Sequence, residues 1–407
     1  MISKPTSAPA PIGAEERQTR LGNLRQSMEA AGVEAVLLGS TTSLRYFTGL
    51  DWYASERLVG ALVHGSGGLD YITPRFELEK IEGLVTLPGE ILTWEEDESP
   101  WRLVAERLGA RGRLALDERM ALAMYRSLRA EIADERLTDA APLIHALRSR
   151  KSPAEIALMR YAKAITIEVH KRAHAQLRAG QRASEVVRFI DDEHRALGGS
   201  GNSFCIVSFG ADTSLPHGGE GDRALAPGDV VLIDTGTRID GYSSDITRTY
   251  VFGEATPDVR RVWDAEKRAQ AAAFEAARPG VSCETVDAAA RRSLAADGFG
   301  PGYALPGLPH RTGHGIGLDI HEGPYLVKGD TTPLATGMCF SNEPMIVVPG
   351  MFGVRLEDHF HVTDAGPEWF TRPQHSLDEP FADVPGRLIA GHQGLSNLAH
   401  LVGLGPG

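Results

Sequence analysis

The feature that most constrains this chain is a pair of apolar runs on either side of a polar turn, VVLIDTGTRIDGYSSDITRTYVF. Val230–Ile233 and the alternating run Ile246–Phe252 are typical of strands, and Gly236 and Gly241 lie between them. Glycine adopts the positive φ values that tight hairpin turns require. The sequence therefore predicts a β-hairpin at this point of the chain.

Two aspartates lie at the open edge of the predicted hairpin. Asp234 ends the first run and Asp245 begins the second, so strand pairing would bring their carboxylates side by side. Two carboxylates at that separation repel each other unless a cation or a proton lies between them. We therefore expect the two side chains to share a metal ion.

Composition limits the classes of protein that the chain can belong to. Its 407 residues, 42% hydrophobic and 24% charged, predict a globular protein of more than one domain. A net charge of −12 argues against a nucleic-acid-binding surface. No apolar run approaches the roughly 18 residues of a membrane span. The scattered cysteines Cys205, Cys283 and Cys339 suggest no disulfide framework, so we expect a cytoplasmic protein.

Helix and strand patterns alternate through the first 150 residues. The Pro/Ala-rich stretch 1–14 is expected to be a disordered arm, and the next part, 15–150, is expected to be an α/β domain. The predicted helices are 15–31, a stretch reaching 46–47, and 100–109, and the predicted strands are 33–38, 58–63, 71–73, 84–87, 91–94 and 112–116.

A second domain, predicted over 151–385, begins at a helix-start signal. Ser152 and Glu155 form a capping box around Pro153, which predicts a helix that ends at Gly180. Thr256-Pro257 repeats the start signal. The remaining predicted helices are 184–197, 257–278 and 282–296, and the predicted strands include 204–209, 230–233, 246–252, 338–340 and 354–362. The halves 153–252 and 257–361 thus share the order helix, helix, sheet, and 386–407 is expected to be a surface tail.

Three further stretches could supply metal ligands. His314 lies in GHGIG, Glu343 in NEP, and Glu357 in RLED. Each alone has an ordinary explanation, since a carboxylate at a strand end usually serves a turn or faces water. Together with the two aspartates, however, they place four negative charges and one imidazole in a single domain. Two divalent cations would balance those charges and would leave room for a bridging hydroxide that attacks a carbonyl. Such ligands favour Mn²⁺ and tolerate Co²⁺ or Zn²⁺.

These motifs, with SDITRT eleven residues after the first aspartate, resemble the ligand set of the "pita-bread" metallopeptidases of family M24. The family includes methionine aminopeptidase, aminopeptidase P, prolidase and creatinase. The resemblance covers about residues 152–375, and the first 150 residues resemble the N-terminal domain of the proline-specific branch. It implies an α/β (α+β) fold, in which a creatinase-like N-terminal domain precedes a pita-bread catalytic domain with pseudo-twofold halves.

The resemblance also implies roles for individual residues. Asp234 and Asp245 would hold one metal, His314 and Glu343 would hold the second, and Asp245 and Glu357 would bridge the two. Glu343 would also carry the proton from the nucleophile to the leaving nitrogen.

Three further positions match substrate-contacting residues of the family. His217 would lie near the substrate, and His321 would stabilise the oxyanion of the tetrahedral intermediate. Arg355 would contact the substrate carboxylate or orient Glu357. Ser203, Met345 and Lys328 stand where prolidases carry a tyrosine, a glycine and an arginine, respectively, which leaves specificity open.

By resemblance, the chain would be an Xaa-Pro dipeptidase that acts on small peptides. The alternatives are an aminopeptidase P, a non-peptidase enzyme on the same scaffold such as a dimethylsulfoniopropionate lyase, and a binding protein that has lost catalysis. Creatinase activity is disfavoured because creatinase works without metal. Two-domain members generally form homodimers, in which Trp52 and Tyr53 could close the partner's pocket or simply pack within their own domain.

Overall fold

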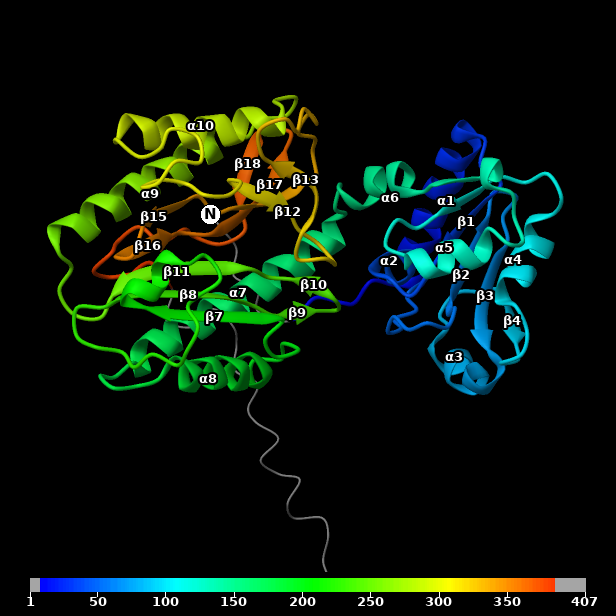
Figure 1. Ribbon diagram of the computed structural model, residues 1–407, viewed down its shortest axis with the longest axis horizontal. Coiled ribbons are helices and arrows are strands. Elements are labelled where there is room, and N and C mark those ends of the chain that lie inside the picture. The colour runs from blue at the N-terminus through cyan, green and yellow to red at the C-terminus, as the bar shows by residue number, and fades with distance from the viewer. Residues whose placement is uncertain (1–7, 385–407) are drawn as a thin grey trace, which may run out of the picture.

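The structure is a computed structural model that describes residues 8–384. Figure 1 shows two parts, an N-terminal part in blue and cyan and a larger part in green to red, joined through α6 (Ala141–Arg148) and α7 (Pro153–Gln176). The predicted tail 386–407 and residues 1–7 of the predicted arm lie outside the described residues. Within this range, no helix is both long and apolar enough to cross a bilayer.

The N-terminal part is a mixed sheet covered by helices on both faces. Strand order is β4-β3-β2-β1-β5-β6, with β1–β2 and β2–β3 antiparallel and the other pairs parallel. Alternate residues of β1 enter two different cores, with Val36 in one and Leu37 in the other. The strands are β1 (Ala35–Leu38), β2 (Gly60–His64), β3 (Leu69–Pro74), β4 (Glu90–Trp94), β5 (Leu114–Leu116) and β6 (Leu137–Asp139). The other helices are α1 (Ala14–Ala31), α2 (Thr42–Thr48), α3 (Leu78–Leu84), α4 (Pro100–Leu108) and α5 (Leu122–Leu128), with short 3₁₀ turns at Arg75–Glu77 and Asp134–Arg136.

Two predictions for this part differ from the structure. The strand predicted at 84–87 is wrong, because Leu84 ends α3 and the next strand, β4, begins only at Glu90. So short a run does not distinguish a helix end from a strand. The described end of the predicted disordered arm, residues 8–13, includes Ile12, which is buried. Its backbone N–H donates to Asp240 Oδ2 at 2.9 Å, so this segment packs against the second part of the chain.

The larger part repeats the order helix, helix, sheet, as predicted. The first half contains α7, α8 (Ala183–Ala196), β7 (Phe204–Phe209), β8 (Val230–Gly236), β9 (Arg238–Ile239), β10 (Tyr242–Ser243) and β11 (Ile246–Val251), with a 3₁₀ turn at Gly210–Ser214. The second half contains α9 (Pro257–Ala276), α10 (Cys283–Ala296), β12 (Gly313–Gly315), β13 (Glu322–Leu326), β14 (Cys339–Asn342), β15 (Met345–Val348), β16 (Phe352–Arg355), β17 (Asp358–Thr363) and β18 (Gly366–Trp369).

The strands of this part lie between two pairs of helices (Figure 1). The sheet β11-β8-β7 shares one core with α7 and α8, and the sheet β13-β12-β14-β17-β18 shares another with α9 and α10. The capping box that begins α7 is confirmed. Ser152 Oγ accepts from the Glu155 N–H at 3.2 Å, and Glu155 Oε2 accepts from the Ser152 N–H at 2.9 Å.

The predicted hairpin is confirmed, with a correction to the role of one glycine. β8 pairs antiparallel with β11, and Asp234 lies opposite Thr247. The turn itself is the small β9–β10 hairpin, where Asp240 (φ 47°) and Gly241 (φ 81°) adopt positive φ. Gly236 is the last residue of β8 and does not have positive φ. A Cβ at Gly236 would lie 1.9 Å from the Ser244 carbonyl oxygen, so glycine is required there for close approach of the two backbones.

The single strand predicted over 354–362 is wrong, because the chain leaves the sheet in its middle. β16 ends at Arg355 and β17 begins at Asp358, so Leu356 and Glu357 lie between two strands. The Glu357 N–H donates to the Thr247 carbonyl at 3.1 Å. This hydrogen bond holds the segment between β16 and β17 against β11, which places Glu357 close to the aspartates of the hairpin.

Candidate metal centre

One cavity of about 700 Å³ collects every site residue that the sequence predicted. Those lining it are Asp234, Asp245, His314, Glu343, Glu357, His217, His321 and Arg355. They come from both halves of the larger part. Asp234 is in β8 and Asp245 precedes β11, whereas His314 is in β12 and Glu343 follows β14. The two halves therefore meet at this cavity.

Neighbouring hydroxyl groups fix the orientation of two of the carboxylates. Thr247 Oγ1 donates to Glu357 Oε2 at 2.7 Å, and Ser341 Oγ donates to Glu343 Oε1 at 3.1 Å. The same Ser341 hydroxyl accepts from the backbone N–H of His314 at 2.9 Å. His314 Nε2 lies 3.1 Å from Glu343 Oε1, without the alignment of a hydrogen bond, and 3.7 Å from Asp245 Oδ2. One face of each carboxylate is thus held by the protein while the other faces the cavity.

The cavity-facing atoms of four of these residues have no hydrogen-bond partner among residues 8–384. They are Asp234 Oδ1, Asp245 Oδ1, His314 Nε2 and Glu357 Oε1. All four side chains are buried. A buried polar atom without a partner costs about 1–3 kcal/mol, so several such atoms in one place indicate a bound group.

Burial and repulsion between neighbouring carboxylates shift the pKa values of the acidic residues in this cluster. Burial raises the pKa of Asp245 well above its usual value, and the charges of Glu357 and Asp234 add to the effect. Burial likewise raises the pKa of Glu357, with Glu343 and Asp234 contributing. Burial also disfavours the Glu343 carboxylate, but its interaction with His314 outweighs this and lowers the pKa of Glu343 to about 2. Asp245 and Glu357, whose pKa values are raised, therefore stay ionised at neutral pH only beside a cation.

The donor set fits divalent metal ions. Ligand atoms of His314, Glu343 and Glu357 lie within 4.8 Å of one another, as do those of Asp245, His314 and His321. Carboxylate oxygens and neutral imidazole nitrogens are ligands for Mn²⁺, Co²⁺ and Zn²⁺. The residues present therefore fit the metal site that the sequence predicted.

The Arg355 side chain is fixed by contacts with other protein groups. It is buried, its Nη2 lies 2.5 Å from Asp234 Oδ2, and its Nε donates to Thr247 Oγ1 at 3.0 Å. Its Nη1 donates to the Pro216 carbonyl at 3.1 Å. Arg355 therefore orients Asp234 and the loop that carries His217, and it acts on Glu357 through Thr247, whose Oγ1 donates to Glu357 Oε2 at 2.7 Å.

The two predicted histidines lie at the exposed side of the cavity. His217 is exposed on the loop that Arg355 holds. The ring of His321 lies 4.0 Å from the ring of His314, centroid to centroid. Partial burial and the neighbouring His314 lower the pKa of His321 to about 4, so this imidazole is neutral at pH 7.

Sequence reasoning missed several residues of the cavity. Arg119 reaches it from the N-terminal part, and its Nη2 lies 3.5 Å from the carbonyl oxygen of His321. His310 and Arg311 line it as well. Thr247 could have been found from its place in SDITRT, two residues after Asp245. Nothing in the sequence indicates Arg119, because about 200 residues separate it from its neighbours.

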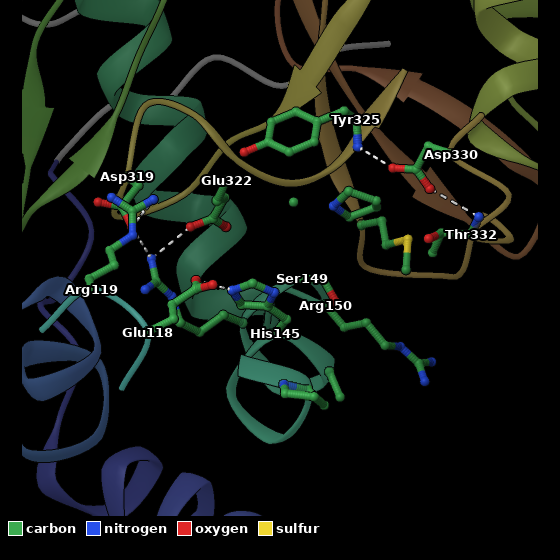
Figure 2. A pocket seen from close by; sticks show the side chains of 16 residues that line it. Glu118, Arg119, His145, Ser149, Arg150, Asp319, Glu322, Tyr325, Asp330 and Thr332 are labelled. Carbon is green, nitrogen blue, oxygen red and sulfur yellow. Dashed lines mark hydrogen bonds and ion pairs between the residues drawn. The ribbon is translucent and has the colours of Figure 1, made fainter. Parts of the chain in front are cut away.

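A second and larger cavity, of about 820 Å³, lies between the two parts of the chain (Figure 2). It shares Arg119 and Asp319 with the first cavity. Arg148 Nη2 lies 2.8 Å from both Asp319 Oδ2 and Glu322 Oε2, and Lys151 Nζ lies 2.5 Å from Glu322 Oε1. In the described chain, no buried side-chain nitrogen or oxygen that lines this cavity lacks a partner. Its charges therefore hold the two parts together.

Comparison with known proteins agrees with this geometry. The profile of Metallopeptidase family M24 matches residues 157–364, and that of the Creatinase/Prolidase N-terminal domain matches residues 20–150. The chain is 36% identical to the "Probable dipeptidase PepE" of Mycobacterium tuberculosis (strain ATCC 25618 / H37Rv), over 89% of this chain and 96% of that protein. It is 32% identical to the "Xaa-Pro dipeptidase" of Lactobacillus helveticus, over 88% of this chain and 98% of that protein.

The fold has solved relatives as well. The crystal structure of dipeptidase PepE from Mycobacterium ulcerans superposes with a TM-score of 0.85 at 35% identity, and the match covers 91% of this chain and 99% of that one. The two family profiles match the two parts of the chain, and the matches to relatives cover about nine-tenths of its length. The chain belongs to metallopeptidase family M24 and carries the creatinase/prolidase N-terminal domain.

Proposed function

We propose that this protein is a two-metal Xaa-Pro dipeptidase. The observation that carries the proposal is the convergence of unpartnered, buried ligand atoms from Asp234, Asp245, His314 and Glu357 in one cavity. The similarity to the Xaa-Pro dipeptidase of Lactobacillus helveticus supports the choice of substrate. The matches of the two family profiles support domains at 15–150 and 151–385.

Five side chains would hold the metal ions. Asp234 and Asp245 bind one ion, His314 and Glu343 bind the other, and Asp245 and Glu357 serve both. A carboxylate-rich set favours Mn²⁺, with Co²⁺ or Zn²⁺ as alternatives. When bound, such a pair lowers the pKa of water and polarises the peptide carbonyl.

Glu343 would move the proton that the reaction requires. Glu343 lines the cavity, and Ser341 Oγ orients its carboxylate by donating to Oε1 at 3.1 Å. It can accept the proton of the attacking water and deliver it to the departing nitrogen. Proline makes this delivery important, since the tertiary amide nitrogen before cleavage has no N–H.

The cavity histidines would bind the substrate and the developing charge. His321 is neutral at pH 7, because the pKa of its imidazole is about 4, so one ring nitrogen carries a hydrogen that can be donated to the oxyanion. His217, on the exposed loop, would contact the substrate. Arg355 would act on the reaction through Asp234, which it contacts at 2.5 Å.

The substrate test is a screen of purified enzyme loaded with Mn²⁺, Co²⁺ or Zn²⁺ against Gly-Pro, Ala-Pro, an Ala-Pro-Xaa tripeptide and dimethylsulfoniopropionate. We expect cleavage of the dipeptides, with much slower cleavage of the tripeptide. Preference for the tripeptide would instead indicate an aminopeptidase P. Release of dimethyl sulfide without peptide cleavage would indicate a lyase.

The enzyme would act as a homodimer in the cytoplasm. Trp52 is buried in the N-terminal core, whereas its stacked neighbour Tyr53 is 63% exposed and available to a partner subunit. The three cysteines are free thiols, which suits a reducing compartment. Sedimentation velocity of the wild type and of Tyr53→Ala tests the dimer, and a monomeric wild type would contradict it.

A further inference from the structure

A sixth side chain faces the candidate metal centre. His359 lies in β17, two residues after Glu357, and its side chain is fully buried. Neither Nδ1 nor Nε2 of its ring has a hydrogen-bond partner within the described part of the chain. Leaving both nitrogens of a buried imidazole unpaired is costly, so simple packing does not explain a histidine at this position.

The alternation of side chains along the chain directs His359 toward the site. Asp358 points the other way, since its Oδ1 lies 2.7 Å from Arg248 Nη2 and its Oδ2 accepts from Gln270 Nε2 at 3.1 Å. Residues on either side of Asp358 therefore share the opposite face. That face is the one on which Glu357 meets Thr247 and the cavity.

The distances suit a shared cation better than a hydrogen bond. His359 Nε2 lies 3.9 Å from Glu357 Oε1, beyond hydrogen-bond range. Ligand atoms of Asp245, Glu357 and His359 nevertheless lie within 4.8 Å of one another. Donors that each bind one ion at roughly 2.0–2.2 Å are separated by about 3–4.4 Å, which is close to this spacing.

We propose that His359 is a sixth ligand of the metal centre and that its Nε2 binds one of the two ions that Asp245 and Glu357 share. The inference rests on the proposed two-metal site and adds a second nitrogen donor to it. Nitrogen donors strengthen binding of Co²⁺ and Zn²⁺ more than binding of Mn²⁺. His359 would thus shift the metal preference of the site toward Co²⁺ and Zn²⁺.

The test measures metal binding without reference to activity. Metal-free wild type, His359→Phe and His359→Gln are titrated with Co²⁺ and with Mn²⁺ by calorimetry, and the visible spectrum of bound Co²⁺ is recorded. His361→Gln is the matched control. It lies on the same strand and face, but its Nε2 contacts Arg160 at 3.1 Å instead of the centre.

We expect both His359 variants to bind Co²⁺ at one site at least about tenfold more weakly, with a smaller loss for Mn²⁺ and an altered Co²⁺ spectrum. The His361→Gln control should match wild type. Equal losses of affinity for Co²⁺ and Mn²⁺ with an unchanged Co²⁺ spectrum would overturn the proposal. A folded His359 variant that binds Co²⁺ as tightly as wild type would overturn it too. Wild type that binds two ions in that experiment leaves the proposed function intact, whereas wild type that binds none contradicts both.

Discussion

The two cavities that share Arg119 and Asp319 hold similar numbers of charged residues and differ in how those charges are satisfied. At the larger cavity, Asp319 and Glu322 pair with Arg148, and Glu322 also pairs with Lys151 behind the cavity wall. Among the described residues that line this cavity, no buried polar side-chain atom lacks a partner. In the smaller one, buried oxygen and nitrogen atoms converge without partners. Cavity size and charge density therefore do not distinguish the proposed metal centre from the larger cavity, whereas the clustering of unpartnered ligand atoms does.

The largest expected effect concerns a matched pair of substitutions, one in each cavity. Asp245→Asn removes a shared ligand from the smaller cavity. It should lower kcat/KM on Ala-Pro by at least ~10⁴-fold, which corresponds to about 5 kcal/mol of transition-state stabilisation. Asp330→Asn, in the larger cavity, should change kcat/KM by less than about threefold. Steady-state kinetics of both variants check this. Similar losses in the two would remove the distinction between the cavities.

Breaking the paired network should reduce stability and leave metal binding unchanged. Arg148→Met removes the nearest cationic partner of Asp319 and one of the two cations that pair with Glu322, so we expect a loss of about 3–5 kcal/mol in the free energy of unfolding. Denaturant unfolding measures the loss, and metal content of the folded variant is the second readout. A folded Arg148→Met protein that has lost its metal would show that the larger cavity belongs to the metal centre.

Gly236→Ala tests the close contact that brings the two aspartates together. The added methyl group would meet the Ser244 carbonyl, and we expect a destabilisation of about 3 kcal/mol. Gly22→Ala, inside α1 with nothing within 4 Å of the added Cβ, should instead be neutral or stabilising by about 0.5–1 kcal/mol. Thermal unfolding compares the two variants. Equal changes in stability for the two variants would show that the close approach of the backbones at Gly236 does not require glycine.

The smallest effect is a pH dependence from a buried histidine behind the hairpin. His170 bonds the Ile246 carbonyl at 3.0 Å, and burial lowers its pKa to about 3. Because the unfolded chain takes up a proton near pH 6.5 and the folded one does not, stability falls as pH drops below 6.5. Between pH 7 and pH 5 this contributes about 2 kcal/mol of loss. Urea unfolding of His170→Gln should show a correspondingly smaller loss, and an identical loss would contradict the assignment.

Local signals made the hairpin and the helix starts predictable. The capping box at Ser152 and the runs that flank Gly241 specify structure within a few residues, and both are confirmed. The apolar run at 84–87 was too short to separate a helix end from a strand. Regular alternation through 354–362 concealed the break at Leu356-Glu357, because the break depends on a backbone bond to Thr247 more than 100 residues away.

The same limit applies to the site. The five proposed ligands could be named because each has a local motif, whereas His359 has none and reads as an ordinary strand residue in DHFHV. Its lack of partners depends on the packing of β17 against β14 and β11. Arg119 enters the cavity only through the way the two domains pack. Both required the three-dimensional structure.

The most direct test is the metal stoichiometry of the purified protein, measured by equilibrium dialysis against Mn²⁺ or Co²⁺ with elemental analysis. We predict two ions per chain in the wild type and in Asp330→Asn, and fewer than two in Asp245→Asn and in Glu357→Gln. Wild type that binds no metal, or an Asp245→Asn variant that keeps both ions, would contradict the proposal that the unpartnered atoms of the smaller cavity form a two-metal centre.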